Sequence, residues 1–149
     1  SASARELVEE AFAPMLRDRS ALLVHSSLDE GNLGNSIATV QFARFTVRVV
    51  VDREQWFVDA AGYRTPNDFV PLEAILGTGD DALDYATREG LRRAAELIYL
   101  KRSTIAWRLN SLLGRVWLAV RVMRADSAHV KKLEAAAERF RQGKERSGR

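Results

Sequence analysis

The sequence predicts an α+β domain with an N-terminal helix, an antiparallel sheet of about four strands, and C-terminal helices. Three observations predict this class. Apolar residues recur at helical spacing near the start of the chain, β-rich segments separated by turn residues follow as far as residue 60, and the pattern is helical again after residue 80. Helices that are segregated from a run of strands are typical of α+β proteins rather than of alternating α/β folds.

The first helix has a clear start signal. Ser3 and Glu6 form a capping box, in which the serine oxygen accepts from a backbone amide of the first turn and the glutamate reaches back. Apolar residues continue at helical spacing to Leu16, but Pro14 has no backbone N–H and its ring clashes with the preceding turn. We therefore expect a helix that begins near Ser3 and is kinked or ended at Pro14.

Four β-rich segments follow, at 21–28, 37–42, 45–51 and 55–60. Gly, Asn and Asp residues, which favour turns, separate the first segment from the second, and only a few residues separate the others. The short connections predict two consecutive antiparallel hairpins. Apolar and polar residues alternate only in part, as in a sheet with one wetter face.

Residues that typically start or end helices mark the helices after the sheet. Pro71 can start a short helix over residues 72–76, which Gly77 closes. Asp80 or Asp81 can then cap a longer helix that runs toward Leu100.

The remaining helical pattern fits two arrangements. It is either one long helix or two helices with a turn near Lys101, with Ser103 as the cap of the second helix or inside it. Ser127 can cap a last helix, whose apolar face ends near Phe140. The apolar stripe of the central region consists of Leu91, Ile98, Ile105 and Leu112, with Ala95, Leu109, Val116 and Met123 beside it.

The bulk composition predicts one folded domain over residues 1–142 and a frayed basic tail over residues 143–149. A chain of 149 residues that is 46% hydrophobic is long enough to build a core. It contains no cysteine, which excludes disulfides, thiolate metal sites and cysteine nucleophiles and suits a reducing compartment such as the cytoplasm. No apolar run approaches the ~20 residues that a membrane span needs, and no secretory signal is expected at the N-terminus.

Charge is distributed unevenly along the chain. Residues 1–84 contain seven Lys or Arg and fourteen Asp or Glu, whereas residues 85–149 contain sixteen and six. A basic helical half can dock on an acidic half within one fold, or it can meet nucleic acid or an acidic protein outside it. The sequence leaves both interpretations open.

Signals for catalysis are weak. His25 and His129 have no second His or Cys at ligand spacing, so we predict no metal site and no cofactor. His25 adjoins Ser26, but neighbouring residues on a strand point to opposite faces, which disfavours a catalytic pair. The Gly-rich segments 31–35 and 77–79 lack the Gly-Lys-Ser/Thr ending of a phosphate-binding loop. We therefore predict that the protein is not an enzyme.

Residues 95–109 resemble a helix-turn-helix. Ala95 is small enough for close helix crossing, Ile98 and Leu100 bracket the turn, and Ile105 and Leu109 anchor the second helix. The segment departs from the usual pattern at two positions, because Tyr99 stands where Gly is common and Lys101 where a small hydroxyl residue is common. This resemblance implies DNA binding. Its candidate contacts to phosphates and bases are Lys101, Arg102, Thr104, Arg108, Asn110 and Arg115.

Residues 7–76 resemble a group of small, largely uncharacterised bacterial proteins. Those proteins combine a leading helix, a Gly-Asn pair that opens a strand and an Asp-Arg-Gly hairpin tip; here the corresponding residues are Gly34, Asn35 and the segment 52–54. A loop, Phe69 and a short helix follow in the same order. Glu54 replaces the usual Gly, which predicts a loop slightly longer than a two-residue turn. The resemblance implies a fold, no established catalytic residues, and a loose link to immunity factors that neutralise a toxin by binding it.

The leading functional prediction is a non-enzymatic protein-binding domain, of an immunity or regulatory type, that sequesters its partner. A DNA-binding regulator that uses residues 95–109 is the alternative, and a homodimer is compatible with either. The expected contact surface is the exposed sheet face or the hairpin around residues 52–55. Arg, Trp and Tyr concentrate binding energy at interfaces, so the candidate partner-binding residues are Arg44, Arg48, Arg53, Trp56 and Tyr63.

Overall fold

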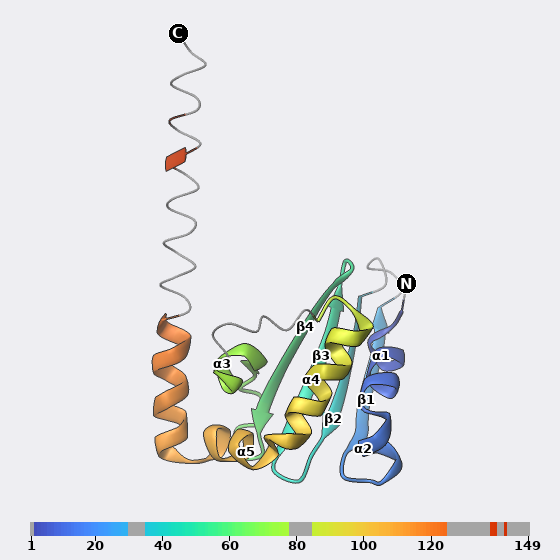
Figure 1. Cartoon of the computed structure of the whole chain (residues 1–149), viewed down its shortest axis with the longest axis horizontal. Coiled ribbons are helices and arrows are strands. Elements are labelled where there is room, and N and C mark those ends of the chain that lie inside the picture. Colours follow the sequence, from blue (N-terminus) through green and yellow to red (C-terminus); the bar gives the residue numbers. More distant parts are fainter. Residues whose placement is uncertain (1, 30–34, 78–84, 125–137, 140–141, 143–149) are drawn as a thin grey trace.

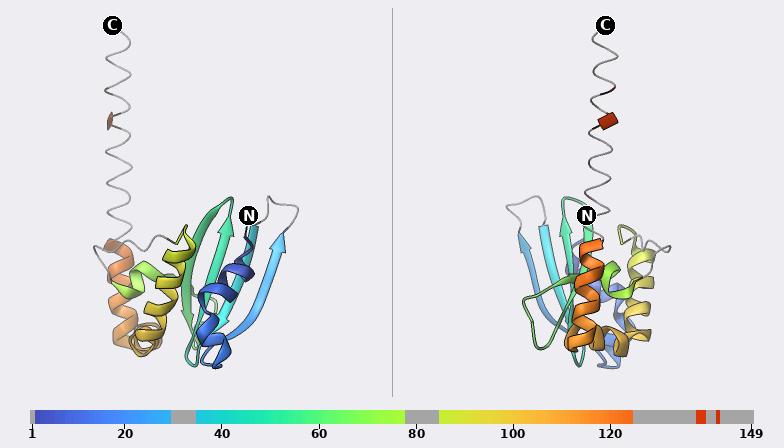
Figure 2. Two further views of the ribbon diagram at one scale, coloured as in Figure 1. Left: turned by 45° about the vertical axis from the view of Figure 1, so that its right-hand side comes forward. Right: turned by 90° about the vertical axis from the view of Figure 1, so that its left-hand side faces the viewer.

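The computed structural model describes residues 2–29, 35–77, 85–124, 138–139 and 142. Within these ranges a twisted antiparallel sheet forms one layer and helices form a second layer on one of its faces (Figures 1 and 2). This arrangement confirms the predicted α+β class. The predicted tail, the cap at Ser127 and most of the predicted last helix lie outside the described residues.

The N-terminal helix begins and breaks where the sequence predicts. α1 (Ala4–Ala11) is capped by Ser3, whose side-chain oxygen accepts from the amide of Glu6 at 3.3 Å. α2 (Ala13–Arg17) carries Pro14 in its first turn, where a missing N–H costs nothing. The chain therefore restarts a helix at Ala13, with Pro14 as its second residue, after one irregular residue, Phe12.

The sheet contains five strands rather than about four. They follow one another in space as in sequence, from β1 to β5, and all neighbours are antiparallel. The additional strand is a two-residue pairing with β4 after a polar loop, which is too short to leave a periodic signal. The strands are β1 (Leu22–Asp29), β2 (Asn35–Gln41), β3 (Phe45–Asp52), β4 (Gln55–Gly62) and β5 (Val70–Pro71).

The hairpin between β3 and β4 is tighter than predicted. Asp52 pairs with Gln55, so only Arg53 and Glu54 form the turn, with φ angles of 49° and 70°. Both residues are thus left-handed, as the twist of a two-residue hairpin requires. The amide of Arg53 donates to the side chain of Asn35 at 3.2 Å, which helps to hold a conformation that glycine would adopt at lower cost.

One face of the sheet carries the core. Alternate residues of β3 are buried beneath α1 and α4, and the intervening ones are partly exposed on the opposite face, which we call the outer sheet face. Phe12 of the N-terminal segment is fully buried and meets Phe42 edge to face. The buried sheet residues of this core include Ala38, Val40, Val47, Val49, Val58 and Ala60.

The short helix and its stop are as predicted. α3 (Leu72–Leu76) is closed by Gly77, which is left-handed with a φ of 67°. α4 (Arg88–Leu100) starts later than predicted, because Thr87 rather than Asp80 or Asp81 is its cap and accepts from the amide of Gly90 at 3.0 Å. The two aspartates lie outside the described residues.

The helical region breaks twice. A first break at Lys101 separates α4 from α5 (Arg102–Asn110), so one continuous helix is excluded, and Ser103 lies inside α5. A second break at Ser111, which the sequence analysis missed, starts a further helix over residues 112–124. Within the described ranges, every helix is too short or too polar to cross a bilayer.

The second break divides the predicted apolar stripe. Leu91, Ile98 and Ile105 are buried, but Leu112 is 81% exposed. Val116 and Met123, beside this stripe in the sequence pattern, are also exposed, so the pattern does not form one buried face. The chain changes direction at Ser111 and presents these side chains to solvent.

Candidate partner-binding surface

The five residues predicted to bind a partner do not form one cluster. Trp56 is opposite Val51 on the helix-covered face of the sheet, where it packs against the core. Arg53 lies in the hairpin tip. Arg48 lies at the centre of the outer sheet face, and only Arg44 and Tyr63, at the far end of the β3–β4 hairpin, are neighbours.

Arg48 has a structural role on the outer sheet face. Its Nε donates to Oδ1 of Asp59, the residue opposite it on β4, at 2.9 Å, and a second guanidinium nitrogen contacts the other carboxylate oxygen. The guanidinium also lies 4.0 Å from the ring centre of Phe69. One bidentate edge and one flat face of the Arg48 guanidinium are thus occupied within the domain.

Arg44 and Tyr63 line a cleft of about 440 Å³ together with Trp107 of α5. The amide of Tyr63 and the side chain of Asn110 both donate to the carbonyl of Arg44, at 3.2 and 2.9 Å, so the backbone there is fixed. Arg64 packs against the Tyr63 ring and donates to its hydroxyl. The cleft lining contains two arginines and two aromatic residues and no carboxylate.

Of the residues predicted to contact nucleic acid, some are exposed and others are bonded to groups within the domain. Lys101, Arg102 and Thr104 are exposed near the start of α5, where the Arg102 guanidinium donates to the carbonyl of Tyr99 and lies over its ring. Asn110 holds Arg44, and Arg115 pairs with Asp68 at 3.4 Å.

Arg108 is the most deeply engaged of this set. It donates to the carbonyl of Ile75 in α3, and its guanidinium lies 4.0 Å from the ring centre of Trp117. Burial, and then the positive charge of Arg121, lower the pKa of Arg108. Its side chain joins α5 to α3 and to the helix over residues 112–124 instead of pointing outward.

The break at Lys101 is a kink rather than a loop. The amide of Lys101 donates to Leu97 and its carbonyl accepts from Ile105, each at 2.9 Å, so helical hydrogen bonding continues across the break. A helix-turn-helix usually has three or four residues in its turn. Here a single residue joins α4 and α5.

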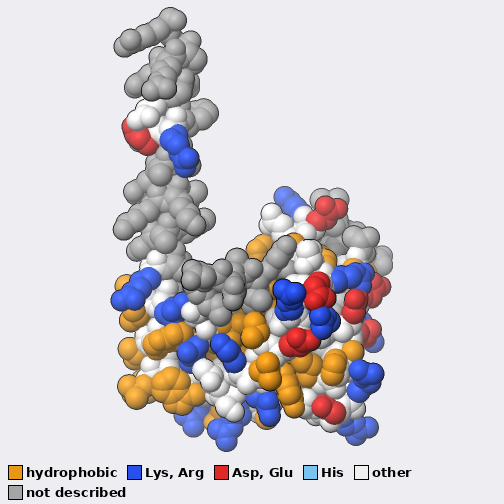
Figure 3. Space-filling view, in the orientation of Figure 1, with side chains coloured by type: hydrophobic (Ala, Val, Ile, Leu, Met, Phe, Trp, Pro, Cys, Tyr) orange, Lys and Arg blue, Asp and Glu red, His pale blue; other side chains and the backbone are white. Residues whose placement is uncertain are grey.

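The strongest candidate surface is one that the sequence analysis missed. Residues 112–124 form a helix whose inner side, around Leu118 and Trp117, packs against the domain. The side turned away from Leu118 is also apolar: Val116 is 56% exposed, Val120 44% and Met123 70%. Figure 3 shows hydrophobic side chains over this helix, with Lys and Arg side chains beside them. We call Leu112, Leu113, Val116, Val120 and Met123 the outer helix face.

Ser111 and Gly114 set the direction of this helix. Ser111 has an extended backbone, with ψ at 152°, and its hydroxyl accepts from the amide of Gly114 at 2.9 Å, as an N-cap does. A Cβ on Gly114 would lie 2.5 Å from the Cα of Arg108, so only glycine lets the two helices approach this closely. Ser111 as an N-cap was therefore the local signal that could have revealed the second break.

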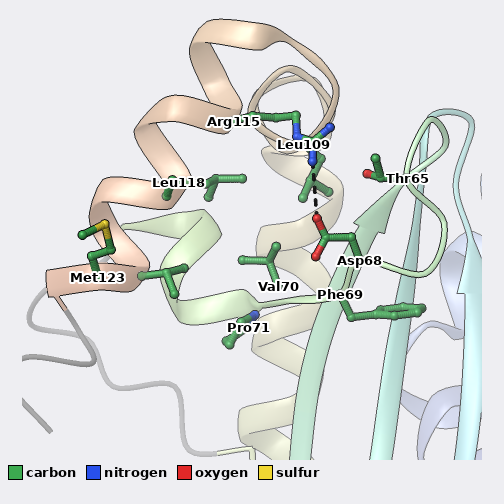
Figure 4. A pocket seen from close by; sticks show the side chains of 11 residues that line it. Thr65, Asp68, Phe69, Val70, Pro71, Leu109, Arg115, Leu118 and Met123 are labelled. Atoms are coloured by element: carbon green, nitrogen blue, oxygen red, sulfur yellow. Dashed lines mark hydrogen bonds and ion pairs between the residues drawn. The ribbon is translucent and has the colours of Figure 1, made fainter. Parts of the chain in front are cut away.

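Behind the 112–124 helix lies a second cleft, of about 430 Å³ (Figure 4). Its walls are Leu118 and Val122 on the helix and Val70 and Pro71 opposite. Met123, on the outer helix face, also contributes to the lining, and the Arg115–Asp68 ion pair links the two sides of the cleft. The helix is thus held against the domain by Leu118, by this ion pair and by the contacts of Trp117.

The geometry gives no separate support to catalysis. His25 is exposed on the edge strand β1 and is paired in register with Thr39. In the described part of the chain, no three His, Cys, Asp or Glu side chains are placed to hold a metal ion. Comparison with protein-family models, curated proteins and solved structures gave no match. The properties of the surface therefore have to be argued from the molecule itself.

Proposed function

We propose that the protein is a non-enzymatic domain that sequesters a protein partner, and that the outer helix face is the centre of its contact surface. One observation carries the proposal: the 112–124 helix is apolar on the side that packs against the domain and on the side that meets solvent. Arg115, Arg121 and Arg124 separate these two apolar sides, and an exposed contiguous apolar stripe of this kind marks an interaction site. A second protein surface would provide the missing cover.

Burial of the outer helix face by a partner would contribute a large share of the binding free energy of a typical interface. Complete burial of one Leu, Val or Met side chain stabilises by about 1.5–3 kcal/mol. Five such side chains lie together on the outer helix face, and contiguous apolar patches of this kind mark interaction sites. Scattered single side chains would not support the same conclusion.

The cleft around Trp107 extends the proposed surface. The described part of this helix, residues 112–124, presents a face ~20 Å long. The area of such a face is smaller than the ~800 Å² that each partner contributes to a typical stable interface. Ser111 lines the cleft and directly precedes Leu112, so the two features adjoin along the chain. Trp107, Tyr63 and Arg44 are residue types that concentrate binding energy.

Site-specific photo-cross-linking in the native cells tests this proposal. A photoreactive residue at position 116 should form an adduct with one protein, and Val120→Asn should reduce that adduct because it places an amide in the apolar contact. The matched control carries the photoreactive residue at position 24, an equally exposed valine on β1. No protein adduct at 116, or equal adducts at 116 and 24, would contradict the proposed function.

A second candidate function, binding of duplex DNA, is favoured by the three exposed residues Lys101, Arg102 and Thr104 at the start of α5. It predicts salt-sensitive retention of the protein on duplex DNA, weakened by the double variant Lys101→Ala and Arg102→Ala for all sequences alike. Retention that is absent at low salt would dismiss this candidate. It also leaves the outer helix face without a role, which is why we rank it second.

A further inference from the structure

We infer that the segment bound by the outer helix face is an acidic amphipathic helix of the partner. This inference rests on the proposed function and specifies the chemistry of the partner. It is carried by two independent features of the described residues: the spacing of the exposed apolar side chains and the charge around them.

The spacing suits a second helix. Leu113, Val116, Val120 and Met123 are exposed and separated by three, four and three positions. This alternation is the one that lets two helices pack along a shared seam, each side chain seated among residues of the other helix. An extended strand would instead need a free sheet edge, which a helix face does not offer.

The charge selects an acidic partner. Residues 97–125 contain one lysine and five arginines and no aspartate or glutamate. With about 100° between successive residues, Arg115 and Arg124 lie on opposite flanks of Val116, about 100° and 80° away. Arg124 is exposed, and Arg115 meets Asp68 only at 3.4 Å. A glutamate on one flank of an incoming helix would pair with Arg124, and one on the other flank would share Arg115 with Asp68.

The same features disfavour two other occupants. A second copy of the chain, packed helix against helix, would bring no further carboxylate from residues 97–125 to pair with these arginines. The apolar face of an interfacial helix carries Leu, Trp or Phe, and aromatic rings are enriched at the level of the lipid headgroups. Trp117, the one aromatic side chain among the described residues 112–124, is turned inward between the guanidinium groups of Arg108 and Arg121.

The test uses the full chain and two synthetic helical peptides. Both have leucines at heptad seam positions over about three heptads; one carries glutamates on the flanks and the other lysines. Fluorescence anisotropy measures their binding. We expect saturable binding of the glutamate peptide that weakens as salt is raised, and much weaker binding of the lysine peptide.

Three variants locate the contact. The double variant Val116→Asn and Val120→Asn should weaken binding of the glutamate peptide at least about tenfold. Arg124→Glu should weaken binding of the glutamate peptide and strengthen that of the lysine peptide. Leu28→Asn changes an equally exposed apolar residue on β1 and should leave both affinities unchanged. Circular dichroism of each variant verifies that the fold is retained.

The outcomes separate this inference from the proposed function. Equal binding of the two peptides, lost in the double variant, would overturn the acidic partner and leave a protein-binding surface. Failure of both peptides while position 116 still cross-links a protein would overturn the acidic helix alone. Binding of anionic vesicles, or concentration-dependent dimerisation, that the double variant abolishes while neither peptide binds would replace the inferred occupant. Failure of the peptides together with no adduct at position 116 would overturn both proposals.

Discussion

Strand β3 and the 112–124 helix differ in how much of their apolar surface the domain covers. β3 buries alternate side chains beneath α1 and α4 and gives its outer side to Thr46, Arg48 and Val50, so the strand is complete within the domain. The helix buries Leu118 on one side but keeps aliphatic side chains on the other. The difference indicates that the side chains of β3 stabilise the domain itself. The helix keeps an exposed apolar surface that only a second molecule would bury.

The core of the sheet layer should be the most sensitive part of the molecule. Phe12→Ala removes a fully buried ring that contacts Phe42, and we expect a loss of about 3–5 kcal/mol in the free energy of unfolding. Urea denaturation measures this change. A loss below about 1 kcal/mol would mean that the site collapses around the cavity and that the core is less closely packed than described.

The junction between the two regions should be the next most sensitive. Gly114→Ala places a methyl group against the Cα of Arg108, and relief of that overlap requires the 112–124 helix to move, at a cost of about 1–3 kcal/mol. The displaced helix should also lose the contacts of Trp117 and bind a partner more weakly. Urea denaturation followed by Trp fluorescence measures the stability, and the same measurement in a background with Trp56→Phe and Trp107→Phe reports the environment of Trp117 alone. Unchanged fluorescence and stability would show that the helix is not fixed at Gly114.

The outer sheet face should contribute an intermediate amount. Asp59→Asn leaves the partly buried guanidinium of Arg48 without its anion, and because both side chains retain contact with solvent we expect a loss of only about 1–2 kcal/mol. Chemical denaturation at two salt concentrations measures this loss. Partner binding through the outer helix face should be unaffected, and a matching loss of binding would place the contact surface on the sheet instead.

The smallest effect on stability is expected at Trp107. Trp107→Ala removes a half-exposed side chain, so the free energy of unfolding should change by less than about 0.5 kcal/mol. Binding to the partner should nevertheless weaken by about tenfold, since a cleft anchor of this type typically contributes strongly. Affinity and stability are measured on the same preparation. A large stability loss with unchanged affinity would remove the cleft from the proposed surface.

Local signals in the sequence predicted the fold well. The cap at Ser3, the interruption at Pro14 and the stop at Gly77 each follow from the chemistry of one or two residues, and the structure confirms them. The β3–β4 turn was one exception, beside the cap of α4 and the break at Ser111, because the contact from Asn35 supports two left-handed residues without a glycine. That contact joins residues far apart in sequence, so a local sequence pattern does not predict it.

The candidate surface was far less predictable. Periodicity groups Leu112 with Leu91 and Ile98 on one stripe, but it does not tell which apolar residues are covered once the chain turns. Of the predicted partner-binding residues, only Arg44 and Tyr63 meet, because Trp56 falls on the helix-covered side of its strand and Arg48 is paired with Asp59. The strand register decides both which face of the sheet Trp56 occupies and which residue lies opposite Arg48.

The central claim is that the outer helix face serves binding and not the stability of the domain. The free energy of unfolding of the double variant Val116→Asn and Val120→Asn tests it most directly, with Leu118→Ala on the buried side of the same helix as the matched comparison. The account predicts a change of less than about 0.5 kcal/mol for the double variant and a loss of about 2–5 kcal/mol for Leu118→Ala. A loss of comparable size in both would mean that the outer face is part of the core of the folded protein and would contradict the proposed function.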